Sequence, residues 1–346
     1  MKFRIMSTVR FNGHPMKKIL FRHESFLAFA IIFFSILITL INPSFFTLEN
    51  FFDLLKSFSL TGTFAIGMLF VLISGGIDLS FTAIATVSGY TIAVLLLNMG
   101  DRLNIFLIFL IAGVIGVLLG ILNGAIIDVF KIPSMITTIA TSNIFYGLLT
   151  VITKGKWLYG FPTWFGDFAQ IRVITLRTAE GWPYGLSIIT LIWIVLLLTA
   201  WIILKFTVLG RSIYAMGSNP VSAQRAGFNL RRLHLFVYGF MGLMAGFGSV
   251  IQALLVQTVA PNSLVGKEMD VIAAVVLGGA SLTGGTGTVL GALLGVTLLG
   301  ILGNGMTLMH VPSLWYKVII GVVILVSVSF TAYRRKQSIR KRVITE

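Results

Sequence analysis

A glycine pair followed by a carboxylate, Gly75-Gly76-Ile77-Asp78-Leu79-Ser80, separates two long apolar stretches of the sequence. Adjacent glycines interrupt a helix, because each glycine costs about 1 kcal/mol relative to alanine there. If the flanking stretches cross a membrane, an aspartate between them costs roughly 2.5–3.5 kcal/mol on insertion scales, so its presence requires a reason. We favour an interpretation in which Asp78, assisted by Ser80, caps the next helix by accepting hydrogen bonds from its first amides. Direct contact of Asp78 with a substrate or a gate is the alternative.

Gly278 and Gly279 begin a second glycine-rich segment, which runs to Thr288. A phosphate-binding P-loop ends in Gly-Lys followed by Ser or Thr, and that sequence occurs nowhere in this chain. We therefore interpret the segment as a helix break and a turn. The chain is predicted to have no ATPase site, no cofactor and no metal of its own. It also contains no cysteine, which excludes disulfides and thiolate ligands.

Uncharged polar residues recur inside the apolar stretches, and their hydroxyl and amide groups can bind a neutral polyol through hydrogen bonds. As pathway candidates we select Asn123, Thr137, Asn143 and Asn304. Each of them alone is more often a packing contact between helices. Charged groups are nearly absent from the middle of these stretches, which argues against a proton-coupled or sodium-coupled carrier.

Two carboxylates, Glu268 and Asp270, lie near the expected outer end of a later apolar stretch. A role in docking or gating and a simple solvent-facing position are equally compatible with this placement. The complete set of candidates for a pathway or gate combines these carboxylates and the four polar residues above with the two breaks, Gly75, Gly76, Asp78, Ser80, Gly278 and Gly279.

A short polar segment, Asn219 to Gly227, lies in a basic loop between two long apolar stretches. Asn219 can cap a helix, Pro220 suits the first helical position, and Gly227 suits the left-handed residue that ends one. The pattern predicts a rigid helix of two turns. Such a helix is suited to docking onto a soluble partner and transmitting its motion to the membrane-embedded part of the chain.

The elements that must position these residues are membrane-spanning helices. Apolar residues make up 57% of the sequence, only 11% of residues are charged, and the mean hydropathy is +0.98, which excludes a soluble globular domain. We predict an all-α polytopic membrane protein with about ten transmembrane helices. The eighth is expected to be broken or tilted, because its purely apolar part, Val271 to Leu282, is too short to cross a bilayer. The predicted spans are Phe26–Ile41, Leu54–Ile73, Ser80–Asn98, Ile105–Ile127, Ser134–Thr153, Leu186–Lys205, Leu233–Val256, Val265–Leu282, Thr288–Met309 and Pro312–Phe330.

The net charge of +15 comes from Lys and Arg that gather before the first span, in the central loop and in the tail. The positive-inside rule explains this distribution better than a nucleic-acid partner does. Both termini are then cytoplasmic, and the number of crossings is even. We divide the chain into a basic cytoplasmic N-terminus (1–25), a transmembrane domain (26–330) that contains a central coupling loop (206–232) and an outer loop (154–185), and a basic cytoplasmic tail (331–346).

A weak internal repeat relates the two halves of the chain. Residues 116–124 resemble 295–305, and Ile132-Pro133-Ser134 parallels Val311-Pro312-Ser313 in the same register. A further parallel, 74–80 with 277–283, has a longer offset. The repeat pairs spans two to five with spans seven to ten, and it is expected to be inverted because the two sets cross in opposite directions. Repeats of this kind commonly flank a substrate path near the bilayer midplane.

Three motifs in this order together resemble the permeases of the ribose/xylose/arabinose-type ABC importers, in the branched-chain amino acid/sugar permease superfamily. They are Ser74 to Ser80, the loop from Gly210-Arg211-Ser212 to Gly227, and Asp270 to Gly279, and the resemblance covers nearly the whole chain. It implies a permease of the bacterial inner membrane that moves a monosaccharide by alternating access. That sugar is expected to be like ribose, xylose or galactose, or an autoinducer-type sugar, because Lys154 to Pro162 is similar to the autoinducer branch.

The same resemblance implies partners for the chain in the bilayer, none of them a nucleic acid. They are a second copy or a paralogue, a cytoplasmic ABC ATPase that binds ATP and magnesium, and a periplasmic or lipid-anchored sugar-binding protein. The resemblance identifies the segment from Asn219 to Gly227 as a coupling helix, and it places the ATPase contact at Asn219, Pro220, Ala223, Arg225 and Gly227.

Two alternatives remain open on the residues alone. One is a secondary carrier or channel for a small neutral solute, and the other is a membrane scaffold or receptor without transport. The chain also departs from the common family pattern at Phe81-Thr82 and at Lys267. These departures bear on the identity of the substrate and on the gate, and they leave the family resemblance intact.

Overall fold

The computed structural model describes residues 23–325 except 179, 313 and 324. Most of the predicted N-terminal segment 1–25 and all of the predicted tail 331–346 therefore lie outside the described residues. Within the described part the chain is almost entirely helical, and the core consists of apolar side chains shared between helices.

Eight helices in the described part are long and apolar enough to cross a membrane, which confirms an all-α polytopic membrane protein. Asparagine, serine or threonine side chains cap the start of several of them, as at Thr47, Asn104 and Thr288. The eight are α2 (His23–Ile41), α3 (Leu48–Ile73), α4 (Phe81–Met99), α5 (Ile105–Phe130), α6 (Ser134–Thr153), α8 (Ile188–Phe206), α11 (Leu230–Val256) and α13 (Val289–Leu308).

In the described residues, the other two predicted spans are not continuous helices long enough to cross a membrane. At the eighth span the helix α12 covers only Lys267–Leu277, because Gly278 and Gly279 end it. Its 11 residues reach about 16 Å at 1.5 Å per residue, roughly half of a hydrocarbon core. At the tenth span a shorter apolar helix, Leu314–Val323, is described, and residues 326–330 lie outside the described part.

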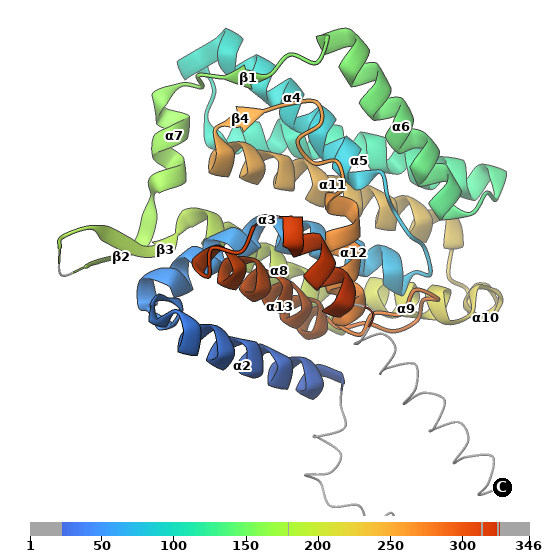
Figure 1. The fold of residues 1–346 in the computed structure, drawn as a ribbon. Helices are drawn as coiled ribbons and strands as arrows, with labels where there is room; N and C mark the ends of the chain where they lie inside the picture. The colour runs from blue at the N-terminus through green and yellow to red at the C-terminus, as the bar shows by residue number, and fades with distance from the viewer. Residues whose placement is uncertain (1–22, 179, 313, 324, 326–346) are drawn as a thin grey trace, which may run out of the picture.

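Short elements gather at the two ends of the bundle. The helices α9 (Val208–Ser218) and α10 (Pro220–Arg225) lie at one end, and α7 (Thr163–Gln170) lies at the other with a protruding β-hairpin (Figure 1). The hairpin pairs β2 (Arg172–Arg177) with β3 (Pro183–Ser187), and a second antiparallel pair joins β1 (Leu158–Tyr159) to β4 (Thr258–Val259). Two 3-10 turns complete the fold, η1 (Pro43–Phe46) and η2 (Gly100–Arg102).

Glycine allows α5 and α11 to pack backbone against backbone. A Cβ atom at Gly116 would overlap the carbonyl oxygen of Gly242, and one at Gly120 would overlap that of Tyr238. Small residues at such contacts are typical of helix association in membranes, where close packing replaces the hydrophobic driving force. The glycines of the sequence 116–124, selected above as part of a repeat, thus lie on the face of α5 that approaches α11.

Corresponding helices of the two halves make corresponding contacts. The helix α11 packs against α4 and α5, as α3 packs against α12 and α13, and α4 contacts α5 as α12 contacts α13. After α5 and after α13 the chain turns through a left-handed residue, Lys131 or His310, each with φ of 55°. Ile132-Pro133 and Val311-Pro312 follow directly, as the predicted register requires.

The parallel between residues 74–80 and 277–283 has no such counterpart in the fold. The first segment precedes α4, whereas the second follows α12, which occupies the place of α4 in the other half. The similarity between these two segments reflects their shared glycine-rich composition, because both provide helix breaks, and they are not equivalent positions of the repeat.

Candidate functional site

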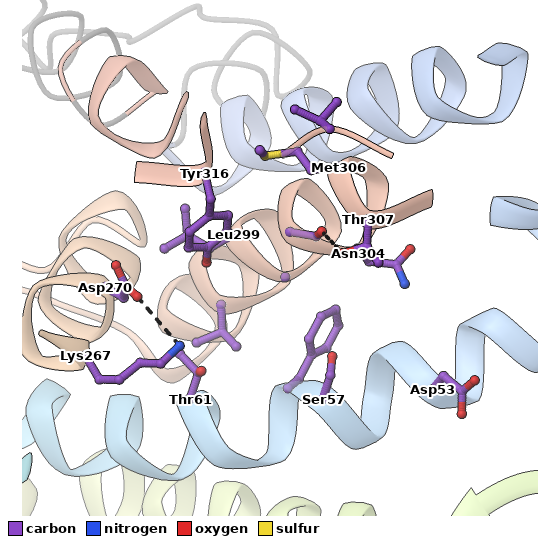
Figure 2. A pocket seen from close by; sticks show the side chains of 15 residues that line it. Asp53, Ser57, Thr61, Lys267, Asp270, Leu299, Asn304, Met306, Thr307 and Tyr316 are labelled. Atoms are coloured by element: carbon purple, nitrogen blue, oxygen red, sulfur yellow. Dashed lines mark hydrogen bonds and ion pairs between the residues drawn. The ribbon is translucent and has the colours of Figure 1, made fainter. Parts of the chain in front are cut away.

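A polar cavity of about 570 Å³ lies between α3, α12, α13 and the segment that follows α13 (Figure 2). It contains two of the predicted pathway residues, Asp270 and Asn304. Six further polar residues line it that the sequence analysis did not select: Asp53, Ser57, Thr61, Lys267, Thr307 and Tyr316.

The polar side chains on α3 share one face because they recur every four residues. Asp53, Ser57 and Thr61 are spaced in this way, so they form a stripe along the wall of the cavity. Opposite them, at the start of α12, Lys267 Nζ lies 3.9 Å from Asp270 Oδ2, a long separation for an ion pair. This separation leaves donor capacity on the ammonium group and acceptor capacity on the carboxylate.

The helix α13 contributes an amide to the cavity, and two of its glycines make room for aromatic rings from α3 and from the segment after α13. Asn304 Nδ2 donates to Asn50 Oδ1 at 2.8 Å, while Asn304 Oδ1 has no hydrogen-bond partner among the described residues. Gly300 provides the space in which the ring of Phe58 lies, since a Cβ at that position would overlap it. The ring of Tyr316 lies 3.2 Å from where a Cβ at Gly303 would be.

A second group of predicted residues meets at the break before α4. The buried Asp78 carboxylate accepts hydrogen bonds through Oδ1 from the amide of Ser80 at 2.7 Å and from its hydroxyl at 2.6 Å. The same hydroxyl accepts from Asn123 Nδ2 at 2.7 Å, so that three predicted residues form one chain of hydrogen bonds. Ser80 is the N-cap of α4, and Asp78 thus fixes the residue at which the helix begins. We call these three residues the Asp78 network.

Residues of α6 hold the extended segment between Gly76 and Ser80. Ser134 Oγ accepts from the amide of Ile77 at 3.0 Å, and Thr138 Oγ1 accepts from the amide of Leu79 at 3.1 Å. These contacts satisfy amides that have no partner in a helix or strand, which a buried segment requires. Neither Ser134 nor Thr138 was among the predicted site residues, because hydroxyls are common in membrane helices and carry no distinctive spacing.

A smaller cavity of about 230 Å³ adjoins this break. Gly75, Gly76, Ser134 and Tyr238 line it, together with Pro220 of α10. It therefore lies at the end of the bundle that carries α9 and α10, between the break and the predicted coupling helix (Figure 1).

The remaining predicted pathway residues fall elsewhere. Glu268 accepts from Thr82 Oγ1 at 3.3 Å and from the amide of Gly266 at 3.0 Å, so it joins the start of α12 to α4 and does not line the larger cavity. Thr137 is buried, and its hydroxyl has no partner among the described residues. Asn143 is exposed on α6.

The segment from Asn219 forms the short helix expected from its sequence. Asn219 caps α10 by accepting from the amide of Ser222 at 3.0 Å, Pro220 occupies the first turn, and Gly227 has φ of 90°. Ala223 is buried, whereas Val221 and Arg225 are exposed. The helix thus presents apolar and basic groups outward, as a docking element requires.

Glycines from three distant segments meet beside this helix, in what we call the glycine junction. Gly75 ends α3, Gly217 precedes α10, and Gly284-Gly285 follow α12. The amide of Gly285 donates to the carbonyl oxygen of Ile73 at 2.9 Å. A Cβ atom at Gly217 would overlap that same oxygen, and one at Gly284 would lie 2.7 Å from the Cα of Gly75. Two of the three sequence motifs, and the glycine-rich segment that follows the third, therefore contribute to one backbone contact.

Comparison with known proteins gives a consistent set of relatives. Residues 50–328 match the family described as branched-chain amino acid transport system / permease component. The ribose import permease protein RbsC of Haemophilus influenzae is 34% identical over 90% of this chain and 93% of its own length. RbsC of Bacillus subtilis is 34% identical over 85% and 88%, and the autoinducer 2 import system permease protein LsrC of Yersinia pestis is 31% identical over 84% and 79%. No solved structure gave a significant match.

Proposed function

The chain belongs to the permease family of sugar ABC importers, and from this premise we propose that it imports a monosaccharide across the bacterial inner membrane by an ATP-driven mechanism. It is a multi-pass protein of that membrane. Ribose is the first candidate, because the ribose permeases are the most similar of the relatives described above, and autoinducer 2 is the second.

The coupling loop supports an assignment of the two faces of the bundle. Its basic residues and the docking shape of α10 favour the cytoplasm, where an ABC ATPase would bind. The helix α13 begins beside α9, because Tyr214 of α9 donates to the carbonyl oxygen of Gly287 at 2.6 Å. The helix α3 ends at the same place. The opposite ends of α3 and α13, which enclose the larger cavity, then face the periplasm. Ten crossings with both termini in the cytoplasm, and an inverted repeat, are part of this proposal.

The position of the glycine junction supports alternating access. Movement of α10 on the ATPase would shift Gly217, and Gly217 contacts both the end of α3 and the loop after α12. Those two segments are the helix breaks that adjoin α4 and α12. ATP binding inside and receptor docking outside would each favour one of two arrangements through their different contacts.

The partners in this proposal are the ones that an importer of this kind requires. A second copy or a paralogue completes the membrane part, an ABC ATPase binds ATP and magnesium, and a sugar-binding protein delivers the cargo from outside. The chain itself is a transport subunit in this scheme, without an ATPase site, a metal or a cofactor of its own.

The observation that carries the proposal is that two of the three sequence motifs and the glycine-rich segment after the third meet at one junction beside α10. The test is reconstitution of the chain in liposomes with its ATPase and its sugar-binding protein. We expect uptake of D-ribose that requires ATP on the side of the ATPase, and no uptake when any component is absent. Full uptake by the chain alone, or uptake driven by an ion gradient without ATP, would instead establish a channel or a secondary carrier.

A further inference from the structure

We propose that the larger cavity between α3, α12 and α13 is a binding subsite for a neutral polyhydroxylated ligand, a monosaccharide, inside a single copy of the chain. The inference rests on the proposed import of a sugar and adds the place where the sugar binds. All residues of the subsite come from one chain, so it is distinct from a path formed only between two permease copies.

The charges of the cavity favour a neutral ligand. Lys267 supplies donors, Asp53 and Asp270 supply acceptors, and the hydroxyls of Ser57 and Thr61 do both. The ammonium group of Lys267 would repel a cation, and the carboxylates of Asp53 and Asp270 would repel an anion. A sugar hydroxyl donates and accepts, so adjacent hydroxyls can bind both members of the long Lys267–Asp270 pair, which are 3.9 Å apart.

The apolar lining suits the other face of a sugar ring. The aromatic rings of Phe58 and Tyr316 lie in spaces left by Gly300 and Gly303, and both line the cavity. Small-molecule sites usually combine such apolar surface with a few placed polar groups. Asn304 lines the same wall, and its Oδ1 is buried without a partner among the described residues.

The size and position of the cavity agree with a subsite that an incoming sugar would occupy first. Its volume of about 570 Å³ falls within the usual range of roughly 300–1,000 Å³ for ligand pockets. It lies at the end of the bundle away from α10, where a sugar would arrive from outside.

The test uses the cysteine-free chain as a background for a single cysteine. Ser57→Cys places a thiol in the wall of the cavity, and Thr163→Cys, at the start of the exposed helix α7, is the matched control outside it. The assembled transporter in nanodiscs is treated with a charged thiol reagent, with and without D-ribose, D-xylose or D-galactose. At about ten times its half-saturating concentration, a bound sugar should slow the modification of Ser57→Cys about tenfold and leave Thr163→Cys unchanged.

A second variant tests whether the carboxylate of Asp270 contacts the sugar. Asp270→Asn keeps the size of the side chain and removes its charge, and we expect the sugar concentration that protects Ser57→Cys to rise about tenfold. Asp101→Asn, in the turn η2, is the matched control and should have no effect.

The outcomes separate this inference from the proposed function. ATP-driven uptake of a sugar that gives no protection of Ser57→Cys would overturn the subsite and leave the import function intact. Protection by sodium or by inorganic phosphate instead of a sugar would also overturn it. Protection by a sugar in a chain that supports no ATP-driven uptake would establish the subsite and contradict the proposed function.

Discussion

At the scale of single residues, the most informative position is Asp78. Its carboxylate is buried, yet it contacts no positive group in the described residues and accepts hydrogen bonds from the backbone and the hydroxyl of Ser80. The favoured interpretation is that Asp78 caps α4, assisted by Ser80. The carboxylate accepts from the amide of Ser80, which is the N-cap residue, but the side chain of Ser80 makes no capping hydrogen bond of its own. A direct role toward substrate remains a separate proposal, which the following variants address.

We predict that Asp78→Asn retains folding and sugar uptake, whereas Asp78→Ala loses stability. Asparagine keeps an oxygen that can accept from the amide of Ser80, but alanine leaves that buried amide without a partner, which costs about 1–3 kcal/mol. The measurement is the thermal denaturation of each variant in detergent, followed by uptake in liposomes. Loss of uptake in a normally folded Asp78→Asn variant would show that the negative charge itself is needed.

At the scale of elements, the glycine junction joins the predicted coupling helix to both helix breaks. It consists of backbone atoms in close contact, so that small movements of one segment cannot be absorbed by side chains. We therefore expect Gly217 to transmit motion, because it lies in the last turn of α9, just before α10, and contacts the carbonyl oxygen at the end of α3.

Gly217→Ala should lower the amount of sugar imported per ATP hydrolysed about tenfold, while the ATPase rate stays near its normal value. The added methyl group overlaps the oxygen of Ile73, and overpacking of this kind costs about 1–3 kcal/mol. The measurement compares uptake and phosphate release in the same liposomes. Gly147→Ala is the matched control, since no atom lies within 4 Å of a Cβ at that helical position. An unchanged ratio of sugar to ATP in Gly217→Ala would contradict the transmission role.

The sequence predicted the spanning helices and the capped helix α10 because both depend on local patterns. Apolar runs of spanning length mark the helices, and Asn219, Pro220 and Gly227 mark the start and end of α10. The helix α9 was missed, because its 11 residues carry no apolar run long enough to cross a bilayer. The short α12 was expected as a broken or tilted eighth span, because the purely apolar part of that span, Val271 to Leu282, is too short to cross a bilayer.

The candidate site was predictable only in part, because it depends on contacts between distant segments. Asp78, Ser80 and Asn123 were selected, and the structure brings them together. Asp53, Ser57 and Thr61 were missed because their spacing of four is also that of an ordinary helix face. Only the approach of α12 and α13 makes this face part of a cavity.

At the scale of the whole molecule, the two halves of the chain make corresponding helix contacts, and they share the turns at Lys131 and His310. The proposed inverted repeat pairs the helix Leu314–Val323 with α6 of the first half, so we predict that the tenth span crosses the membrane. The number of crossings is then ten, although α12 is a helix of only 11 residues.

This topology predicts that the end of the chain and the coupling loop face the same side of the membrane. A reporter that is fluorescent only in the cytoplasm, fused after residue 346, should be active, and an alkaline phosphatase fused at the same point should be inactive. A phosphatase inserted in the hairpin loop between β2 and β3 should be active, because that hairpin lies at the opposite end of the bundle (Figure 1). An active phosphatase at the C-terminus would mean an odd number of crossings, and the basic tail would then break the charge asymmetry from which the orientation was inferred.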